Sequence, residues 1–189
     1  MKFSYKPGFS CLILTLLSAG PAAAAEVDLN VNNNAARLTV EIPSPSNNLV
    51  FDGSWLHSNN GDAASVAGHV TGKALAAGPL KAGVGLRLSY VSHDGAEDED
   101  GVNLGVGGFL RYTVPEYDRF GLGTSLYYAP NVLAFGDTEN FLDFTVWGGY
   151  SVIPDADVYV GWRRTRVKLD EAGSRNIDGG WLIGVRARF

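Results

Sequence analysis

Oppositely charged residues recur through this sequence at alternate positions, and their types suit ion pairing rather than catalysis. Arginine guanidinium groups form bidentate, charge-assisted hydrogen bonds with the carboxylates of Asp and Glu. Within one narrow enclosed space, such residues would either pair into a salt-bridged plug or line a weakly anion-preferring conduit. The sequence does not choose between these two arrangements. The candidate residues are Asp28, Arg37, Glu41, Asp52, Arg87, Arg111, Asp143, Arg163, Arg186 and Arg188.

His57 and Ser58 are the one pair that could support nucleophilic catalysis. They are adjacent at the expected end of a strand, with acidic residues nearby, and they resemble the His/Ser site of PagL-type lipid A deacylases. A serine nucleophile needs its base within hydrogen-bond reach, whereas adjacent residues of a strand point to opposite faces. We therefore favour a polar pair at a rim and assign no catalytic residue. A lipid-modifying outer-membrane enzyme is kept as the alternative function.

Metal, thiol and cofactor chemistry find little support in the sequence. The acidic stretch 93–101 clusters carboxylates that suit Ca²⁺ or Mg²⁺, but it lacks the spacing of an EF-hand loop, so we expect a solvated surface loop. His69 is interpreted as an interior hydrogen-bonding residue, and His93 has no partner at metal-binding spacing. The single cysteine, Cys11, lies in a segment that we expect to be removed. We predict no metal site and no cofactor.

Residues 1–25 have the three parts of a secretory signal peptide. Lys2 and Lys6 give a positive start, an apolar run follows, and small residues lead to a cut placed after Ala25. The apolar run is far shorter than the ~20 residues of a membrane-spanning helix, which disfavours a retained anchor. We predict one mature domain over 26–189, more acidic than the net charge of −5 of the full chain. This charge argues against nucleic acid as a partner.

The C-terminal stretch 177–189 shows the two-residue period of a β-strand. Its odd positions are apolar or Gly, and its even positions carry all of its charge. The same alternation recurs along the mature chain, with large apolar residues on one face and Gly, Ser, Thr and scattered charges on the other. A soluble lipocalin-like barrel or sandwich would instead fill its interior with bulky residues. We predict an all-β fold, a transmembrane antiparallel up-and-down β-barrel.

Two kinds of connection separate the alternating segments. Pro-containing turns alternate with polar, often acidic segments: the turns at 43–47, 75–80, 114–118 and 153–155, and the polar segments at 58–62, 93–101, 129–139 and 169–176. Short turns at one rim and longer loops at the other are typical of bacterial outer-membrane barrels, with the turns in the periplasm. We predict ten strands, or eight if the short first hairpin over 27–42 does not span. The alternation becomes irregular at Arg163-Arg164, where we expect either a bulge or the top of the membrane zone.

The outer rim and the last residue carry two further expectations. Arg164, Arg166 and Lys168 fall near the outer rim, where they could pair with lipopolysaccharide phosphates. The final aromatic residue, Phe189, resembles the C-terminal signal that outer-membrane barrels carry for their assembly machinery. The expected partners are therefore outer-membrane lipids and lipopolysaccharide, the barrel-assembly machinery, and small solutes or ions if the pore is open.

Several Gly- and aromatic-rich motifs recur in the first half of the mature chain: Asp52-Gly53-Ser54-Trp55-Leu56-His57, Gly61-Asp62, Val66-Ala67-Gly68, Ala77-Gly78-Pro79-Leu80 and Gly83-Val84-Gly85. Together they resemble the YfaZ family of outer-membrane proteins. The resemblance covers most of the mature chain and implies a small porin-like barrel in the outer membrane of a Gram-negative envelope, although none of its motifs is a catalytic signature. The function expected is a porin-like channel or a structural envelope protein with a charged, Arg-rich lumen, and not an enzyme.

Overall fold

The chain is described by a computed structural model, which is considered over residues 25–45, 48–72, 78–93, 99–136, 138–169 and 173–189. The predicted signal peptide and the centre of the acidic stretch 93–101 lie outside these described residues. Within them, nearly all of the chain is β-strand, interrupted by tight turns and one short 3-10 helix. None of the helical structure in the described ranges is long and apolar enough to cross a membrane.

The strands follow one another in the order that the alternating pattern predicts. Their bounds are β1 Glu26–Val31, β2 Ala35–Pro43, β3 Leu49–Ser58, β4 Gly61–Thr71, β5 Leu80–His93, β6 Glu99–Thr113, β7 Phe120–Ala129, β8 Ala134–Gly136, β9 Thr138–Ile153, β10 Ala156–Leu169 and β11 Gly173–Arg188, with the 3-10 helix η2 at Asn131–Leu133. The β8 strand has only 3 residues, so it is too short to span a bilayer. The other strands are those predicted from the sequence.

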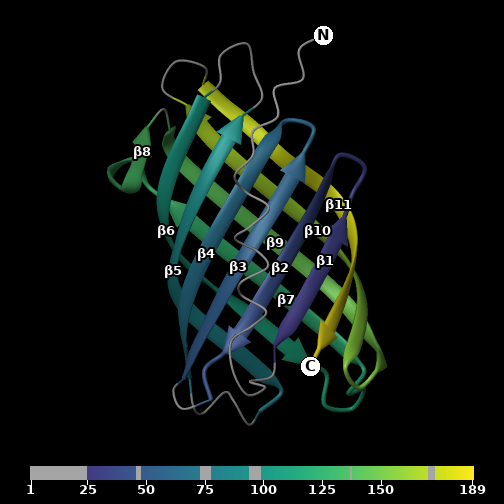
Figure 1. Cartoon of the computed structure of the whole chain (residues 1–189). Helices are drawn as coiled ribbons and strands as arrows, with labels where there is room; N and C mark the ends of the chain where they lie inside the picture. Colours follow the sequence, from purple (N-terminus) through teal and green to yellow (C-terminus); the bar gives the residue numbers. More distant parts are fainter. Residues whose placement is uncertain (1–24, 46–47, 73–77, 94–98, 137, 170–172) are drawn as a thin grey trace.

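Ten of these strands form a closed antiparallel barrel (Figure 1). Strands that are consecutive in the chain pair with each other, except that β7 pairs with β9 and the short β8 pairs with β6 beside the ring. The ring closes between β1 and β11, through a register that runs from Glu26↔Arg188 to Val31↔Ile183. The short first hairpin is therefore part of the wall. The predicted fold class and the preferred count of ten strands are confirmed.

The outer face of the barrel is apolar, as a wall in contact with lipid requires. Large apolar side chains remain exposed there, among them Val84 at 70%, Val66 at 60% and Ile183 at 62%. The aromatic residues predicted for the girdles also point outward: Trp55, Tyr90, Tyr112, Tyr128, Tyr150, Trp162 and Trp181. A soluble protein seldom exposes so many large apolar groups, so this surface fits a bilayer and excludes the soluble alternative.

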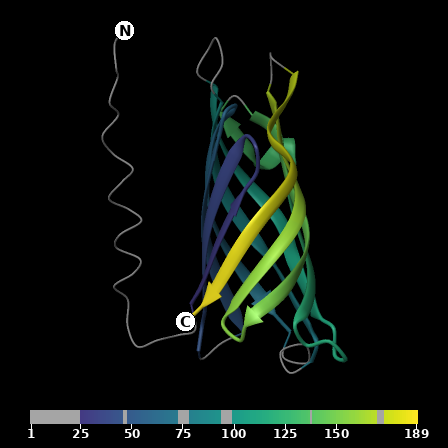
Figure 2. The same cartoon turned by 90° about the vertical axis from the view of Figure 1, so that its right-hand side faces the viewer.

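The two ends of the barrel differ, and we call them the turn end and the loop end (Figure 2). At the turn end lie the Pro-containing connections and both termini of the wall, where the Phe189 amide donates to the Ala25 carbonyl at 2.9 Å. The opposite loop end carries the polar connections. The predicted connection 129–139 agrees with the interval between the end of β7 at Ala129 and the start of β9 at Thr138, and it contains η2 and β8. The predicted length of 169–176 is wrong, because β11 already begins at Gly173. Strand pairing continues into this polar segment because it satisfies the backbone groups there.

A register shift near the loop end changes which residues of β11 face inward. Thr165 pairs with Asp178 but Arg166 pairs with Asn176, so Ile177 is an extra residue on β11. Both Ile177 and Asp178 consequently point into the barrel, with exposed fractions of 0% and 2%. The alternation of 177–189 predicts Ile177 on the outer face, and that prediction is wrong because a bulge places two successive residues on one side.

Candidate functional site

The inside of the barrel is filled at the loop end by apolar side chains, which we call the apolar layer. One residue comes from each of β2, β3, β4, β5, β7, β9, β10 and β11 (in chain order Ala35, Leu56, Ala63, Val91, Ala129, Phe141, Val167 and Ile177). Leu56, Val167 and Ile177 are completely buried, and Phe141 is 3% exposed. The layer therefore fills the inside of the barrel near the loop end with apolar side chains.

The interior changes from apolar to polar within one step along the strands. The next inward residue toward the turn end is Arg37 beside Ala35, Asp143 beside Phe141 and Thr165 beside Val167. All three of these polar residues are buried. Two residues along a strand correspond to about 6.6 Å, so a polar region lies immediately behind the apolar layer. The sequence predicts only small or charged inner positions. That prediction is wrong at the loop end, where bulky apolar groups fill the lumen.

Asp143 is the centre of the polar region, which we call the central network. Its carboxylate accepts from both terminal nitrogens of Arg37 at 3.1 and 3.0 Å, from Nη1 of Arg87 at 3.0 Å, and from the Thr165 hydroxyl at 2.9 Å. Arg87 also donates through Nη2 to Asp52 at 3.3 Å. Buried charges are tolerated when they are paired and hydrogen-bonded, and every charge in this group has such a partner.

Aromatic and imidazole groups complete the central network. The guanidinium carbon of Arg87 lies 3.7 Å from the centroid of the Tyr127 ring, which is within cation–π range. The Tyr127 hydroxyl is hydrogen-bonded to Nε2 of His69. Nδ1 of His69 lies 3.4 Å from Oδ2 of Asp52 but forms no hydrogen bond. His69 is 1% exposed, which agrees with its predicted role as an interior hydrogen-bonding residue.

A second group of charges, the turn-end network, continues the ion pairs toward the turn end. Arg111 pairs with Glu26 at 2.9 Å and with Glu41 at 2.7 Å, and Arg186 pairs with Glu26 at 3.0 Å and with Asp28 at 3.1 Å. Arg188 contacts Glu26 and Asp157. The exposed fraction of the arginine side chains rises from 0% at Arg163 to 24% at Arg111 and 38% at Arg188. The lumen is thus drier toward the loop end and wetter toward the turn end.

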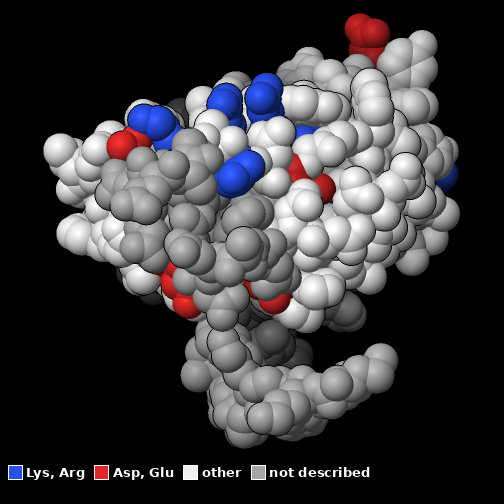
Figure 3. Space-filling model, turned by 90° about the horizontal axis from the view of Figure 1, so that it is seen from above, with Lys and Arg blue, Asp and Glu red and all other residues white. Residues whose placement is uncertain are grey.

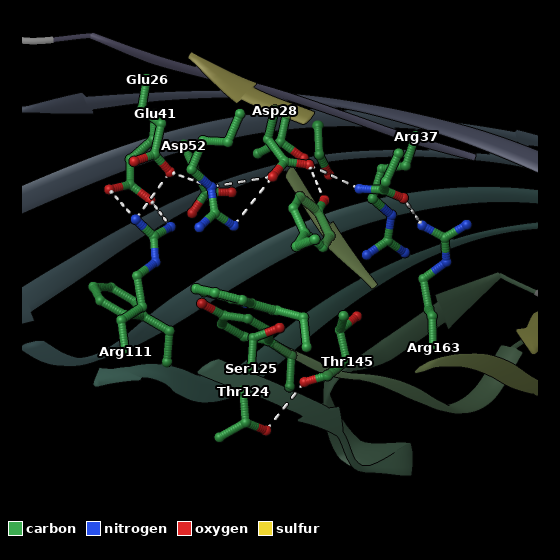
Figure 4. Close-up of a pocket in the computed structure, with 18 of the residues that line it drawn as sticks. Glu26, Asp28, Arg37, Glu41, Asp52, Arg111, Thr124, Ser125, Thr145 and Arg163 are labelled. Carbon is green, nitrogen blue, oxygen red and sulfur yellow. Dashed lines mark hydrogen bonds and ion pairs between the residues drawn. The ribbon is translucent and has the colours of Figure 1, made fainter. Parts of the chain in front are cut away.

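Between the two networks lies a cavity of about 100 Å³ whose wall is mostly polar (Figure 4). Arginine side chains reach into it from several strands, and the carboxylates of Glu26, Glu41 and Asp28 face them across it. Arg37, Arg87 and Arg163, which belong to its lining, each have one buried guanidinium nitrogen without a hydrogen-bond partner among the described residues. A space with a mostly polar wall suits water or a small polar solute.

All ten residues predicted to line the lumen are found on its inner side. Arg37, Asp52, Arg87 and Asp143 meet in the central network, while Asp28, Glu41, Arg111, Arg186 and Arg188 meet in the turn-end network. Arg163 lies between them and donates to Asp178 at 2.5 Å and to Asn30. The set predicted from the sequence is incomplete. It omits Glu26, Tyr127, Asp157, Tyr159 and Asp178, although the alternation along β10 already placed Asp157 and Tyr159 on the inner face.

The residues predicted for the rim and for assembly lie on the outside. Arg164, Arg166 and Lys168 are exposed, and they alternate with the buried Arg163, Thr165 and Val167. Phe189 is 75% exposed at the turn end. Their positions leave them free to contact lipid or other proteins, and the roles assigned to them from the sequence stay predictions.

His57 and Ser58 point to opposite sides of the wall. His57 is exposed, and its Nδ1 lies 2.6 Å from Oδ1 of Asp62. The Ser58 hydroxyl is buried, where it donates to the carbonyls of Gly61 and Ile177, each at 2.8 Å. A base outside the barrel cannot activate a hydroxyl inside it, so the pair cannot work as the nucleophile and base of a deacylase.

Metal binding has no support in the described part of the chain. No group of three or more His, Cys, Asp or Glu residues there is arranged to hold a metal ion. The acidic residues at 94–98, which the sequence marked as a possible cation loop, lie outside the described residues. Of that stretch, Asp100 accepts a hydrogen bond from the Tyr90 hydroxyl at 2.8 Å.

Comparison with known proteins gives matches that span almost the whole chain. The family model described as "YfaZ precursor" matches residues 5–189. Outer membrane protein YfaZ of Escherichia coli (strain K12) is 25% identical over 175 residues, which cover 92% of this chain and 93% of that protein. Among solved structures, the KdgM porin is 13% identical with a TM-score of 0.47, over 88% of this chain and 99% of that one. The NanC porin is 10% identical with a TM-score of 0.43, over 89% and 100%.

Proposed function

The chain belongs to the YfaZ family of outer-membrane proteins, and we propose that it is a porin-like barrel whose lumen is closed at rest by the apolar layer. Its location is the outer membrane. The single observation that supports the closed state is the set of eight inward apolar residues, one from each of eight strands. Apolar constrictions of this kind stop ions because water does not wet them.

The charged residues behind the apolar layer support a closed lumen as well. An anion-preferring conduit needs cations whose charge is available to a passing ion. In the central network, each arginine is instead bonded to a carboxylate of the wall, Arg37 to Asp143 and Arg87 to both Asp143 and Asp52. An ion on its way through would have to replace these buried pairs, which is costly. Of the two arrangements left open by the sequence, the salt-bridged plug is the one that the geometry favours.

The orientation of the barrel determines which compartment reaches the charged cavity. Short turns of bacterial barrels face the periplasm, so we place the turn end in the periplasm and the loop end at the cell surface. On this placement, the turn-end network and the cavity communicate with the periplasm, whereas the apolar layer seals the surface side. The protein would then act as a closed envelope barrel that conducts only when the apolar layer is displaced.

Single-channel recording in planar bilayers tests this proposal. The wild-type barrel is compared with the double variant Leu56→Ala/Phe141→Ala, which removes two large groups from the apolar layer. The matched control is Leu122→Ala/Phe120→Ala, which removes the same atoms from the outer face, where these residues are 56% and 51% exposed. We expect no conductance steps for the wild type and the control, and steps for the layer variant.

Two results would contradict the proposal. Steps of similar size in the wild type and in the layer variant would show that the lumen is open at rest. Silence of the layer variant, with insertion verified by the protein content of the recovered vesicles, would show that the apolar layer is not the barrier.

A further inference from the structure

Three basic side chains form a row on the outside of β10, and we call Arg164, Arg166 and Lys168 the basic row. Each is exposed, while Thr165 and Val167 between them are completely buried in the lumen. Alternate residues of a strand are about 6.6 Å apart, so the three cations follow one another along the wall toward the loop end. Seen from this end, Lys and Arg side chains gather on one sector of the rim (Figure 3).

The basic row begins directly beyond a group of aromatic side chains on the outer face. Trp162 precedes Arg164 by two residues and packs against Phe144, with ring centroids 6.0 Å apart. Its cross-strand neighbour Trp181 is 77% exposed. Such aromatic residues mark the boundary between the apolar band and the headgroups of a bilayer. The basic row therefore lies at the level of the headgroups on the loop-end side.

The members of the basic row differ in how well the protein itself neutralises them. Lys168 forms an ion pair with Glu139, and Arg166 donates to the Ser174 hydroxyl. Arg164 has no hydrogen-bond or ion-pair partner among the described residues. At the level of the headgroups an exposed cation costs little, and Arg164 is free to take its counter-charge from outside the chain.

We propose that the basic row binds phosphate groups of lipopolysaccharide in the outer leaflet. The loop end faces this leaflet if the turn end is periplasmic, and guanidinium groups match phosphate oxygens in bidentate geometry. Arg164 and Arg166 would present two such groups to neighbouring phosphates. The opposite sector of the wall is less suitable, since the outward residues near its rim include Asp62, which is 48% exposed, and the exposed Asp100. This inference is independent of whether the lumen conducts.

Binding measurements with purified lipids test the proposal. The detergent-solubilised, folded barrel is immobilised, and Kd is measured by surface plasmon resonance for lipopolysaccharide, for lipopolysaccharide stripped of its phosphates, and for phosphatidylglycerol. The double variant Arg164→Gln/Arg166→Gln is compared with Lys81→Gln/Arg119→Gln, which removes the same charge from exposed positions at the turn end. Heat-modifiable mobility on a gel verifies that each variant is folded.

For the basic-row variant we expect lipopolysaccharide to bind at least about tenfold more weakly, because two charge-assisted hydrogen-bonding groups are lost. The turn-end variant should stay within about twofold of the wild type, since its charges are remote from the site. Arg164→Gln alone should weaken binding more than Lys168→Gln, which already has Glu139 as a partner.

Three outcomes would overturn the inference. Equal losses in the two double variants would show that only net charge matters. Undiminished binding of the dephosphorylated lipid would exclude the phosphates as the ligand. Equally tight binding of phosphatidylglycerol, with the same loss in the basic-row variant, would make the site one for anionic headgroups in general and not for lipopolysaccharide.

Discussion

Replacement of Asp143 by Asn should destabilise the barrel strongly. Among the described residues, Asp143 is the only carboxylate that pairs with Arg37, whose side chain is 10% exposed, and it also binds Arg87. An amide has the size of the carboxylate but carries no charge and only one acceptor oxygen. In the variant, Arg37 would therefore remain buried without a counter-ion, while Arg87 would keep Asp52 at 3.3 Å.

The magnitude follows from the bonds that are lost. Arg37 donates two charge-assisted hydrogen bonds to Asp143 and Arg87 donates one, and such bonds contribute about 1.5–3 kcal/mol each. The amide oxygen retains part of one bond, and removal of one partner from a buried ion pair typically costs about 3–5 kcal/mol. We expect the free energy of unfolding to fall by roughly 3–5 kcal/mol. A second substitution, Arg37→Met, should recover part of this loss, because replacement of both partners removes the uncompensated charge.

The assay is urea unfolding of the barrel in lipid vesicles, followed by tryptophan fluorescence, with Asp62→Asn as the control. Asp62 pairs with His57 on the surface, where the side chains are 48% and 62% exposed, so its loss should cost less than about 1 kcal/mol. A loss of less than about 1 kcal/mol for Asp143→Asn would refute the reasoning, since it would mean that water or a rearranged carboxylate neutralises Arg37 in the lumen.

Two further predictions concern folding and assembly. Gly107→Ala should prevent formation of the heat-modifiable folded barrel, because a Cβ at this position would overlap the carbonyl oxygen of Leu126. The control Gly53→Ala should be tolerated, because the atom nearest to its added Cβ would be 4.0 Å away. Equal folding yields for the two variants would contradict this prediction. Phe189→Ser should lower the amount of folded barrel in the outer membrane of cells. Refolding in detergent should stay unchanged, because the exposed ring at the turn end makes no described contact with the lumen. Unchanged levels in cells would show that Phe189 is not an assembly signal.

The strand count, the order of the strands and the outer face could be predicted from the sequence because a barrel wall imposes a two-residue period. Along β5, for example, Val84, Leu86 and Leu88 are exposed to lipid and Arg87 is buried, as their alternation requires. The same period placed the ten predicted lumen residues on the inner side. It also showed that His57 and Ser58 would face opposite ways, and the structure bears this out.

The departures from the prediction have a common cause. The pairing register of a strand, and the level of its residues along the barrel axis, depend on the neighbouring strands as well as on the strand itself. The bulge at Thr165/Arg166 turned Ile177 inward, and its position depends on how β10 and β11 pair, which no period within β11 reveals. Likewise, the polar segment 169–176 is largely strand because a neighbouring strand is available to pair with it. The stagger of all the strands decides which residues of different strands lie at the same level along the barrel axis. The pattern within one strand does not contain this information.

The sequence by itself determined the fold, the lipid-facing surface and the chemical types that line the lumen, because each of these depends on local alternation. Only the tertiary structure revealed the apolar layer on which the proposed closure of the lumen rests. Leu56, Phe141 and Val167 are unremarkable inner residues of three separate strands, and closure of the ring brings them into one apolar layer. In the same way, only closure of the ring gives Asp143 both Arg37 and Arg87 as partners, because these residues lie on strands that meet across the lumen and are not neighbours in the sheet.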